Sequence, residues 1–308
     1  MLALFRFAFS AMGSRCEVRL YAHDEARASA CAQASIADVR RLDAKYSRYR
    51  ADSVTAEINR VAEVGGAIDV DVETATLLDY AETCFEQSDG LFDITSGVLR
   101  EAWHSERKTL PEPGLLKALL ARVGWSKVRW NRPRLAFGVA GMELDFGGVV
   151  KEYAADRAAV ICAEAGFRHG LVDLGGDIKI IGPHPDGAPW IVGIQHPRDS
   201  DAVMATLDLF HGAVATSGDY ERFIEIDGRR YSHILSPRTG RPVQGLAGVS
   251  VVAEECVVAG SATTIAMLME ERGGAWLEEV GLPHVFMDGD MRIGGTLASD
   301  FAAHASRR

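Results

Sequence analysis

The segment ELDFGGVVKEYAAD (residues 143–156) decides how we interpret the rest of the chain. Alternating apolar and polar residues from position 142 to 146 predict a strand, and helical spacing begins after Gly147 and Gly148. A strand, a glycine pair and a helix start bring free backbone N–H groups and the positive end of a helix dipole to one point. Lys151 lies in the first helical turn, and Asp145 lies just before the glycines. The segment therefore predicts an anion pocket with a carboxylate at its rim; a tight turn with a surface lysine is the plainer alternative.

Outward from this segment, periodicity and turn residues predict a mixture of helices and hairpins. We expect helices at residues 24–45, 54–60, 72–87, 113–122, 149–161 and 255–269. We expect strands in the N-terminal segment MLALFRFAFSAMGSRC and at 16–20, 127–130, 134–137, 169–181 (broken at Gly175-Gly176-Asp177), 190–195, 203–210, 221–226, 229–235 and 247–253. Hairpins should turn at Asp227-Gly228 and Asp288-Gly289. Regular strand–helix alternation is missing, so we expect an α+β fold with a large, mostly antiparallel sheet, in one domain over residues 1–308.

Composition excludes several classes of protein. The apolar fraction is 47% and the formal net charge is −10, which suits a globular protein and argues against nucleic acid or anionic membrane as the main partner. The five cysteines are far apart and lack C-x-x-C spacing, which indicates a reducing compartment. We identify no signal peptide and no apolar run of membrane-span length, so we expect a cytoplasmic protein without a membrane span.

Standard nucleotide and hydrolase motifs do not occur: there is no G-x-G-x-x-G after a strand, no P-loop, no H-E-x-x-H and no G-x-S-x-G. The chain instead has polar residues beside glycines at the ends of apolar segments, a pattern typical of site-bearing loops. Asp93 in GLFDITSG is one example, and the alternative is that it caps the following turn.

These segments together resemble the ApbE family, flavin transferases that move FMN from FAD onto a threonine or serine of a protein. The resemblance runs in the family's order through nearly the whole chain: Met12-Gly13, Tyr49, GLFDITSG, ELDFGGVVKEYAAD, LVDLGGDIKIIG, VATSGDYERF, YSHILSPRTGRPV and the helix after VSVVAEECVVAG. It implies a T-fold-like α+β domain, FAD as substrate, Mg²⁺ as cofactor, and an acceptor flavoprotein with a D-x-x-[ST]-G-A-T-like motif.

Carried over by position, the resemblance implies a set of site residues. Contacts to the flavin nucleotide are implied for Met12, Tyr49, Leu91, Phe92, Asp93, Asp145, Lys151 and Leu235. The last of these lies in HILSPRTG, where Ser236 replaces the family's aspartate. Each residue also has a plainer interpretation: Met12 and Tyr49 as core, Lys151 as a solvated lysine.

The metal helix departs from the family's pattern. The family reads approximately A-D-A-L-A-T, and the matching residues here are AGSATT, so Gly260 stands where the magnesium carboxylate is expected. Thr264 is retained one helical turn later, and the Gly148 carbonyl is the other implied metal ligand. Magnesium is usually held by one or two carboxylates with phosphate oxygens and water. We therefore expect weaker metal binding unless Asp145, Asp219 or the nucleotide's phosphates substitute.

The resulting hypothesis is an FAD-dependent, magnesium-dependent FMN transferase that releases AMP, with His233 as proton acceptor and Asp219 second. Two alternatives stay open. One is an FAD-binding protein that lost transfer chemistry through Gly260, and restoring aspartate there should then raise activity. The other is hydrolysis of FAD to FMN and AMP by water in the same pocket.

Overall fold

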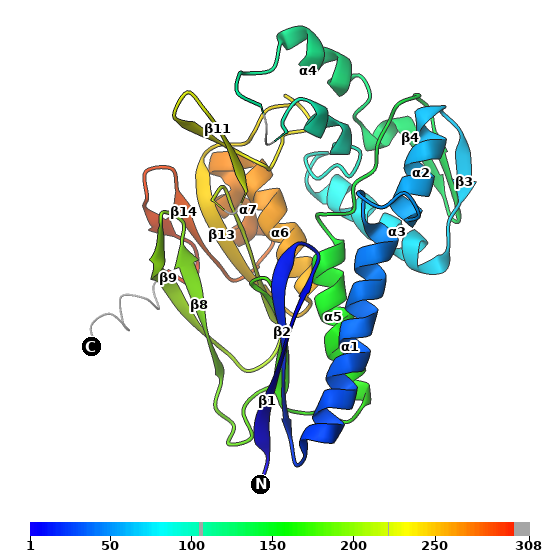
Figure 1. The fold of residues 1–308 in the computed structure, drawn as a ribbon. Helices are drawn as coiled ribbons and strands as arrows, with labels where there is room; N and C mark the ends of the chain where they lie inside the picture. Colours follow the sequence, from blue (N-terminus) through cyan, green and yellow to red (C-terminus); the bar gives the residue numbers. More distant parts are fainter. Residues whose placement is uncertain (105–106, 221, 299–308) are drawn as a thin grey trace.

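The computed structural model describes residues 1–104, 107–220 and 222–298, and its centre is an eight-stranded sheet (Figure 1). The strand order is β1-β2-β6-β7-β10-β13-β14-β15, and every neighbouring pair is antiparallel. The predicted α+β class with a large antiparallel sheet is confirmed. The strands are β1 (Ala3–Ala11), β2 (Ser14–Ala22), β6 (Gly170–Leu174), β7 (Asp177–Gly182), β10 (Ala213–Gly218), β13 (Leu246–Ala253), β14 (His284–Asp288) and β15 (Ile293–Gly294).

Three smaller sheets surround the large one. They are β3-β5-β4, with β3 (Ala67–Asp69), β5 (Arg134–Phe137) and β4 (Val128–Asn131), the hairpin of β8 (Trp190–His196) and β9 (Asp199–Leu209), and the hairpin of β11 (Phe223–Ile226) and β12 (Arg229–Ser232). The helices are α1 (Glu25–Tyr46), α2 (Val54–Glu63), α3 (Val72–Gln87), α4 (Pro113–Leu120), α5 (Val150–Glu164), α6 (Cys256–Leu268) and α7 (Gly273–Glu279), with 3₁₀ turns at Gly97–Glu101, Trp125–Lys127 and Glu270–Arg272.

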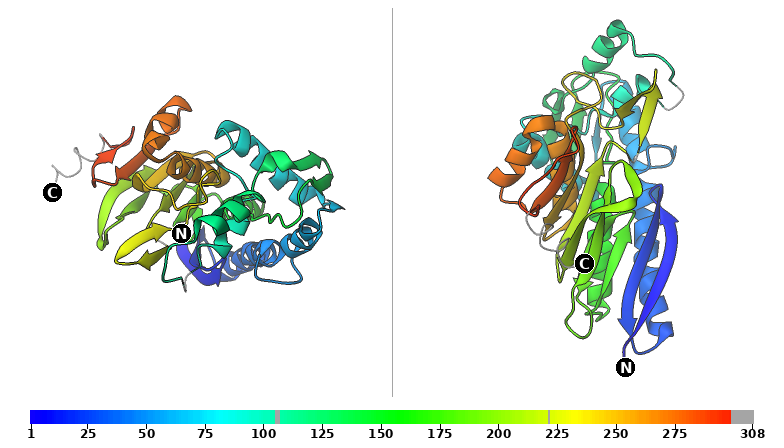
Figure 2. Two further views of the ribbon diagram at one scale, coloured as in Figure 1. Left: turned by 90° about the horizontal axis from the view of Figure 1, so that it is seen from above. Right: turned by 90° about the vertical axis from the view of Figure 1, so that its left-hand side faces the viewer.

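The large sheet buries both of its faces. Successive side chains of a strand point to opposite faces, and in β6 Val172 packs into the apolar cluster of α1 and α5 whereas Leu171 packs against the β8–β9 hairpin. Helices α1 and α5 run side by side along their face (Figures 1 and 2). The sheet is therefore a middle layer between helices and a two-stranded hairpin.

The predicted strand at residues 142–146 is wrong. The segment is extended and makes only an isolated bridge between Glu143 and Ser96. The alternation itself is real, because Met142, Leu144 and Phe146 are all buried. Alternation reports which side chains are buried, but a strand also needs a neighbouring backbone edge, and this segment lies beside loops and a helix.

The amide of Asn59, on α2, replaces that edge. The Leu144 N–H donates to Asn59 Oδ1 at 2.8 Å, and Asn59 Nδ2 donates to the Leu144 carbonyl at 3.0 Å. The Asp145 N–H donates to the carbonyl of Ile94 at 2.8 Å. A side chain from α2 thus satisfies the backbone of the segment that leads into α5.

Three helices and strands were not predicted: β3, β10 and α7. Helix α7 begins with Gly273 and Gly274, which are poor helix formers. A Cβ at Gly273 would lie 2.2 Å from the Ala266 carbonyl oxygen, and one at Gly274 would lie 2.6 Å from the Phe286 ring. Close packing on α6 and β14 requires these glycines, and this tertiary demand is invisible to helix propensity.

Within the described residues, no helix combines the length and apolar character that crossing a bilayer requires.

Candidate active site

The turn between β1 and β2 forms one wall of the candidate site. Met12 (φ 52°) and Gly13 (φ 71°) are both left-handed, and the Met12 N–H donates to Asp43 Oδ2 on α1 at 2.9 Å. A pocket at this turn is lined by residues 10–15 and Asp43. The Cβ position of Gly13 is 3.2 Å from a terminal nitrogen of Arg222, so the strained turn brings Met12 beside a guanidinium.

Four side chains, Arg48, Lys151, Arg222 and His233, form what we call the basic cluster. Desolvation has the largest effect on His233 and lowers its pKa below the usual 6.5. The hydrogen bond with the Arg222 backbone opposes this shift, and the positive charges of the other three residues add to it. His233 is therefore neutral at pH 7. Its Nδ1 lies 2.9 Å from the Arg222 carbonyl oxygen, which only accepts, so we assign the ring proton to Nδ1. Nε2 is left as the proton-accepting nitrogen.

Lys151 is positioned by the start of β7. Its Nζ lies 2.8 Å from Asp177 Oδ2, and Asp177 is itself buried after the Gly175-Gly176 turn. The charge of Lys151 also acts on Cys16 in β2 and on His233. The predicted lysine is thus held by a buried carboxylate at the start of α5 rather than extended into solvent.

Asp145 and Tyr49 meet at Arg48. Asp145 caps the turn, accepting the Gly147 N–H at 2.9 Å, and it forms an ion pair with Arg48 and a longer one with Arg100 at 3.8 Å. The Arg48 guanidinium lies 4.9 Å from the centre of the Tyr49 ring and donates to its hydroxyl at 2.9 Å. Tyr49 is 82% exposed, so this aromatic surface is available to a planar ligand ring.

The GLFDITSG segment is built differently. Asp93 is 7% exposed, and its carboxylate accepts the Thr95 N–H (2.8 Å), the Thr95 hydroxyl (2.6 Å) and the Trp125 N–H (2.9 Å). The turn-capping alternative is confirmed, and no described contact joins this carboxylate to the basic cluster. Phe92 is buried, with its ring 3.2 Å from the Cβ position of Gly148. Leu91 is half-buried beside the cluster that contains α6.

Two further predicted residues, Leu235 and Asp219, lie in loops that follow β12 and β10. Leu235 makes an antiparallel bridge to Pro242, which closes the SPRTGR loop, and the Ser236 N–H donates to the Arg241 carbonyl at 2.8 Å. Asp219 forms two bonds to Arg198, at 2.6 and 2.7 Å, in the loop between β8 and β9. That pairing occupies both oxygens of the carboxylate proposed as a second proton acceptor.

Glu152 is the residue whose position the sequence did not reveal. It is 8% exposed at the contact of α5 with α6, and burial followed by the charge of Asp177 raises the pKa of its carboxyl to about 8. Among the described residues no donor bonds to its Oε2. A Cβ at Gly260 would lie 2.4 Å from Glu152 Cγ, so the side chain occupies the space in front of that glycine.

Donors for a magnesium ion can be tested against these positions. The described residues contain no group of three or more His, Cys, Asp or Glu side chains that suits a metal ion. The Gly148 carbonyl lies at the start of α5, and Thr264 is half-buried on α6 one turn after Gly260. The unpartnered oxygen of Glu152 lies between these helices, and oxygen donors of these three kinds fit the preference of Mg²⁺.

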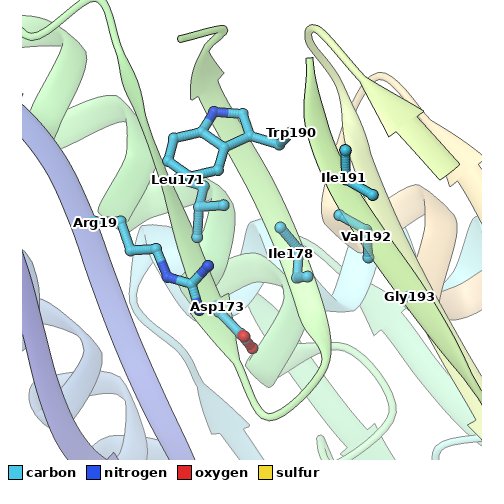
Figure 3. A pocket seen from close by; sticks show the side chains of 8 residues that line it. All are labelled: Arg19, Leu171, Asp173, Ile178, Trp190, Ile191, Val192 and Gly193. Carbon is cyan, nitrogen blue, oxygen red and sulfur yellow. The ribbon is translucent and has the colours of Figure 1, made fainter. Parts of the chain in front are cut away.

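A second pocket lies elsewhere, between the large sheet and β8 (Figure 3). It is lined by Arg19, Leu171, Asp173, Ile178, Trp190, Ile191, Val192 and Gly193. None of these is a predicted site residue, and the basic cluster does not contribute to it.

Comparison with known proteins follows the same segments. The family model described as "ApbE family" matches residues 12–286, from the left-handed turn to β14.

The chain belongs to the ApbE family.

Two curated ApbE relatives are named FAD:protein FMN transferase. The protein from Chlamydia pneumoniae is 32% identical over 78% of this chain and 77% of its own length, and one from Klebsiella pneumoniae is 31% identical over 88% and 80%. Among solved structures, the ApbE protein of Thermotoga maritima superposes with a TM-score of 0.89 at 29% identity, covering 97% of this chain and 99% of that one. The flavinyl transferase ApbE of Pseudomonas stutzeri, in its apo form, gives 0.85 at 28% identity over 97% and 96%. The predicted family and fold are confirmed.

Sequence reasoning missed three charged residues that the ApbE fold brings to this place: Arg48, Arg222 and Glu152. Arg48 precedes the predicted Tyr49, and Glu152 follows the predicted Lys151. A glutamate within a run of small and apolar helix residues was a usable signal for Glu152, because an ionisable group on a buried helix face needs a partner. Arg222 carried no signal, since only the hairpin β11–β12 brings it to Gly13.

Proposed function

We propose that this ApbE protein transfers FMN from FAD to the hydroxyl of a threonine or serine on an acceptor protein and releases AMP. The observation that carries the proposal is the basic cluster at the start of α5, which joins a helix N-terminus, three cations and a neutral imidazole. The names of the curated relatives support the same reaction.

The nucleotide would bind through its charged pyrophosphate and through one of its aromatic ring systems. The pyrophosphate would accept hydrogen bonds from the Gly148 N–H of the turn and from the side chains of Lys151 and Arg222, because the Gly147 N–H already donates to Asp145. A flavin or adenine ring would pack on the exposed face of Tyr49, which Arg48 holds in place. Asp145 fixes Arg48 and the turn together, so its role is to position both.

His233 would take the proton of the incoming hydroxyl on Nε2. The hydroxyl oxygen forms a bond to the FMN phosphorus, and the bond from that phosphorus to the bridging oxygen breaks, leaving that oxygen with AMP. The proton on His233 then passes to AMP or to water, so the reaction is acceptor–OH plus FAD giving acceptor–O–FMN plus AMP. Arg222 and Lys151 lie near enough to His233 to stabilise negative charge developing on the phosphate.

The proposal includes a magnesium ion, which the Gly148 carbonyl, Thr264 and a carboxylate would hold. When bound, it would neutralise charge on the phosphate oxygens.

Intact-mass spectrometry of a threonine acceptor carrying the D-x-x-[ST]-G-A-T motif, after incubation with the protein, FAD and Mg²⁺, tests the proposal. We expect a mass gain of one FMN group that chelation abolishes. Lys151→Met should lower the transfer rate about 100-fold, because a charge-assisted contact to phosphate is lost. Lys117→Met, on exposed α4, is the matched control and should leave the rate unchanged.

Two results would contradict transfer, provided a known active transferase modifies the same acceptor. Free FMN and AMP beside an unmodified acceptor would show a hydrolase. Bound FAD without turnover would show a binding protein that lost its chemistry.

A further inference from the structure

At the contact between α5 and α6, a side chain of α5 fills space that a side chain on α6 would otherwise occupy. Gly260, where the metal carboxylate is expected, has no side chain, and the neighbouring space holds the side chain of Glu152 instead. A Cβ built on Gly260 would lie 2.4 Å from Glu152 Cγ, 2.9 Å from Cδ and 3.1 Å from Oε1. The carboxyl group of Glu152 thus lies about 3 Å from the point where a side chain on Gly260 would begin.

The Glu152 carboxyl has an acidic neighbour, Asp177, and no described donor at its Oε2. It is 8% exposed, no described donor bonds to Oε2, and its acidic neighbour Asp177 already pairs with Lys151 at 2.8 Å. Lys151 therefore pairs with Asp177, and Glu152 lies beside this second buried carboxyl group. Burying an unpaired carboxylate is costly, so a buried group of this kind is stabilised by a proton or by a cation.

Oxygen donors of two other kinds lie on the same two helices, before the first turn of α5 and one turn after Gly260 on α6. The Gly148 carbonyl belongs to the residue four positions before Glu152, at the N-terminal end of α5. Thr264 stands four positions after Gly260 on α6, and that spacing places both on one helix face. A carbonyl, a hydroxyl and a carboxylate are hard oxygen ligands, and together with phosphate oxygens and water they suit Mg²⁺.

The two carboxylates suggested by sequence as substitutes are both engaged elsewhere. Asp145 pairs with Arg48 and Arg100, and both oxygens of Asp219 accept from Arg198. Both carboxylates therefore hold arginine side chains in position instead of facing a metal site.

We propose that Glu152, reaching across from α5, is the magnesium carboxylate of this protein and takes over the ligand position that α6 has lost at Gly260. The proposal rests on the proposed function for the identity of the metal. The proposal also changes the result expected when aspartate is restored at position 260. Gly260→Asp alone places a Cβ 2.4 Å from Glu152 Cγ, so the single change should disturb the α5–α6 contact rather than raise activity.

Direct metal binding is the decisive measurement. Mn²⁺, a spin-active stand-in for Mg²⁺, would be titrated into the full-length protein with FAD present, and free Mn²⁺ followed by electron paramagnetic resonance. Glu152→Gln keeps the shape of the side chain and removes its charge, and we expect it to weaken Mn²⁺ binding at least tenfold. FAD affinity measured in EDTA should change less than twofold. Glu164→Gln, on the exposed end of the same helix, is the matched control and should bind Mn²⁺ as the wild type does.

Equal Mn²⁺ affinity in the wild type and Glu152→Gln would overturn the proposal and leave Glu152 as a protonated partner of Asp177. If Glu152→Gln does not fold, the exchange Glu152→Gly with Gly260→Asp decides: Mn²⁺ affinity within threefold of wild type supports the proposal, and loss of binding overturns it. Failure of the proposed function is separate, because the wild type would then bind Mn²⁺ through Glu152 without modifying any acceptor.

Discussion

Asp93 and Asp145 make the same side-chain bond to a following backbone N–H, but their surroundings differ. Each aspartate accepts the N–H of the residue two positions later, Thr95 at 2.8 Å and Gly147 at 2.9 Å. Asp93 is then closed in by the Trp125 N–H and the Thr95 hydroxyl, whereas Asp145 faces two arginines beside the basic cluster. An aspartate before a glycine-rich turn therefore predicts a turn, and only its surroundings show whether the carboxylate builds the scaffold or positions the site.

The largest effect should come from the buried member of the pair. Asp93→Ala removes the acceptor of three donors in a dry environment, so we expect the free energy of unfolding to fall by about 3 kcal/mol. Urea denaturation measures the change. A variant of normal stability that no longer binds FAD would show that Asp93 contacts the nucleotide and would end the contrast with Asp145.

The next largest effect should come from His233, which belongs to the basic cluster that Asp145 borders. His233→Ala should lower the transfer rate about 100-fold and FAD affinity less than threefold, because the imidazole moves a proton and adds little binding. In the wild type the rate should be level above pH 6.5 and fall as the pH drops through the lowered pKa, since protonation removes the accepting lone pair on Nε2. Equal losses of rate and affinity, or a flat acid limb, would remove the proposed chemical role.

Asp145→Ala should have the smallest effect, and its effect should be on function. Its partly exposed ion pairs are worth at most about 1 kcal/mol of stability, so the urea midpoint should stay close to that of the wild type. Without the carboxylate Arg48 is no longer held, and we expect FAD affinity to fall about tenfold. Glu101→Ala, which breaks the surface pair with Arg122, is a control that should change neither quantity. A loss of stability as large as that of Asp93→Ala would make the two aspartates alike.

Local patterns predicted most of the fold because most of its elements are locally encoded. The hairpin turn at Asp227 and Gly228 has φ values of 52° and 74°, the left-handed pair that this dipeptide favours. Residues 142–146 show the limit of such patterns, since their alternation gave burial correctly and hydrogen bonding wrongly.

The sequence predicted which segments form the site, but it did not predict the charged residues Arg48, Arg222 and Glu152. Lys151, Met12, Tyr49, Asp145 and His233 were identified through the family resemblance, and the structure brings them near one another around Arg48 and Arg222. The assignment of each to FAD stays a prediction. Arg222 and Glu152 act through neighbours more than 100 residues away in the chain, Gly13 and Gly260 respectively, and no short pattern contains that information.

Asn59 attaches the segment before α5 to helix α2 rather than to the large sheet. The segment before α5 is held by the Asn59 amide of α2 and by backbone contacts to Ile94 and Ser96, and not through a ladder of the eight-stranded sheet. Detachment of α2 would free the Leu144 backbone while every pairing of that sheet remained in place. Local opening of this ten-residue helix would therefore remove one anchor of the segment that leads into α5, without any need for global unfolding.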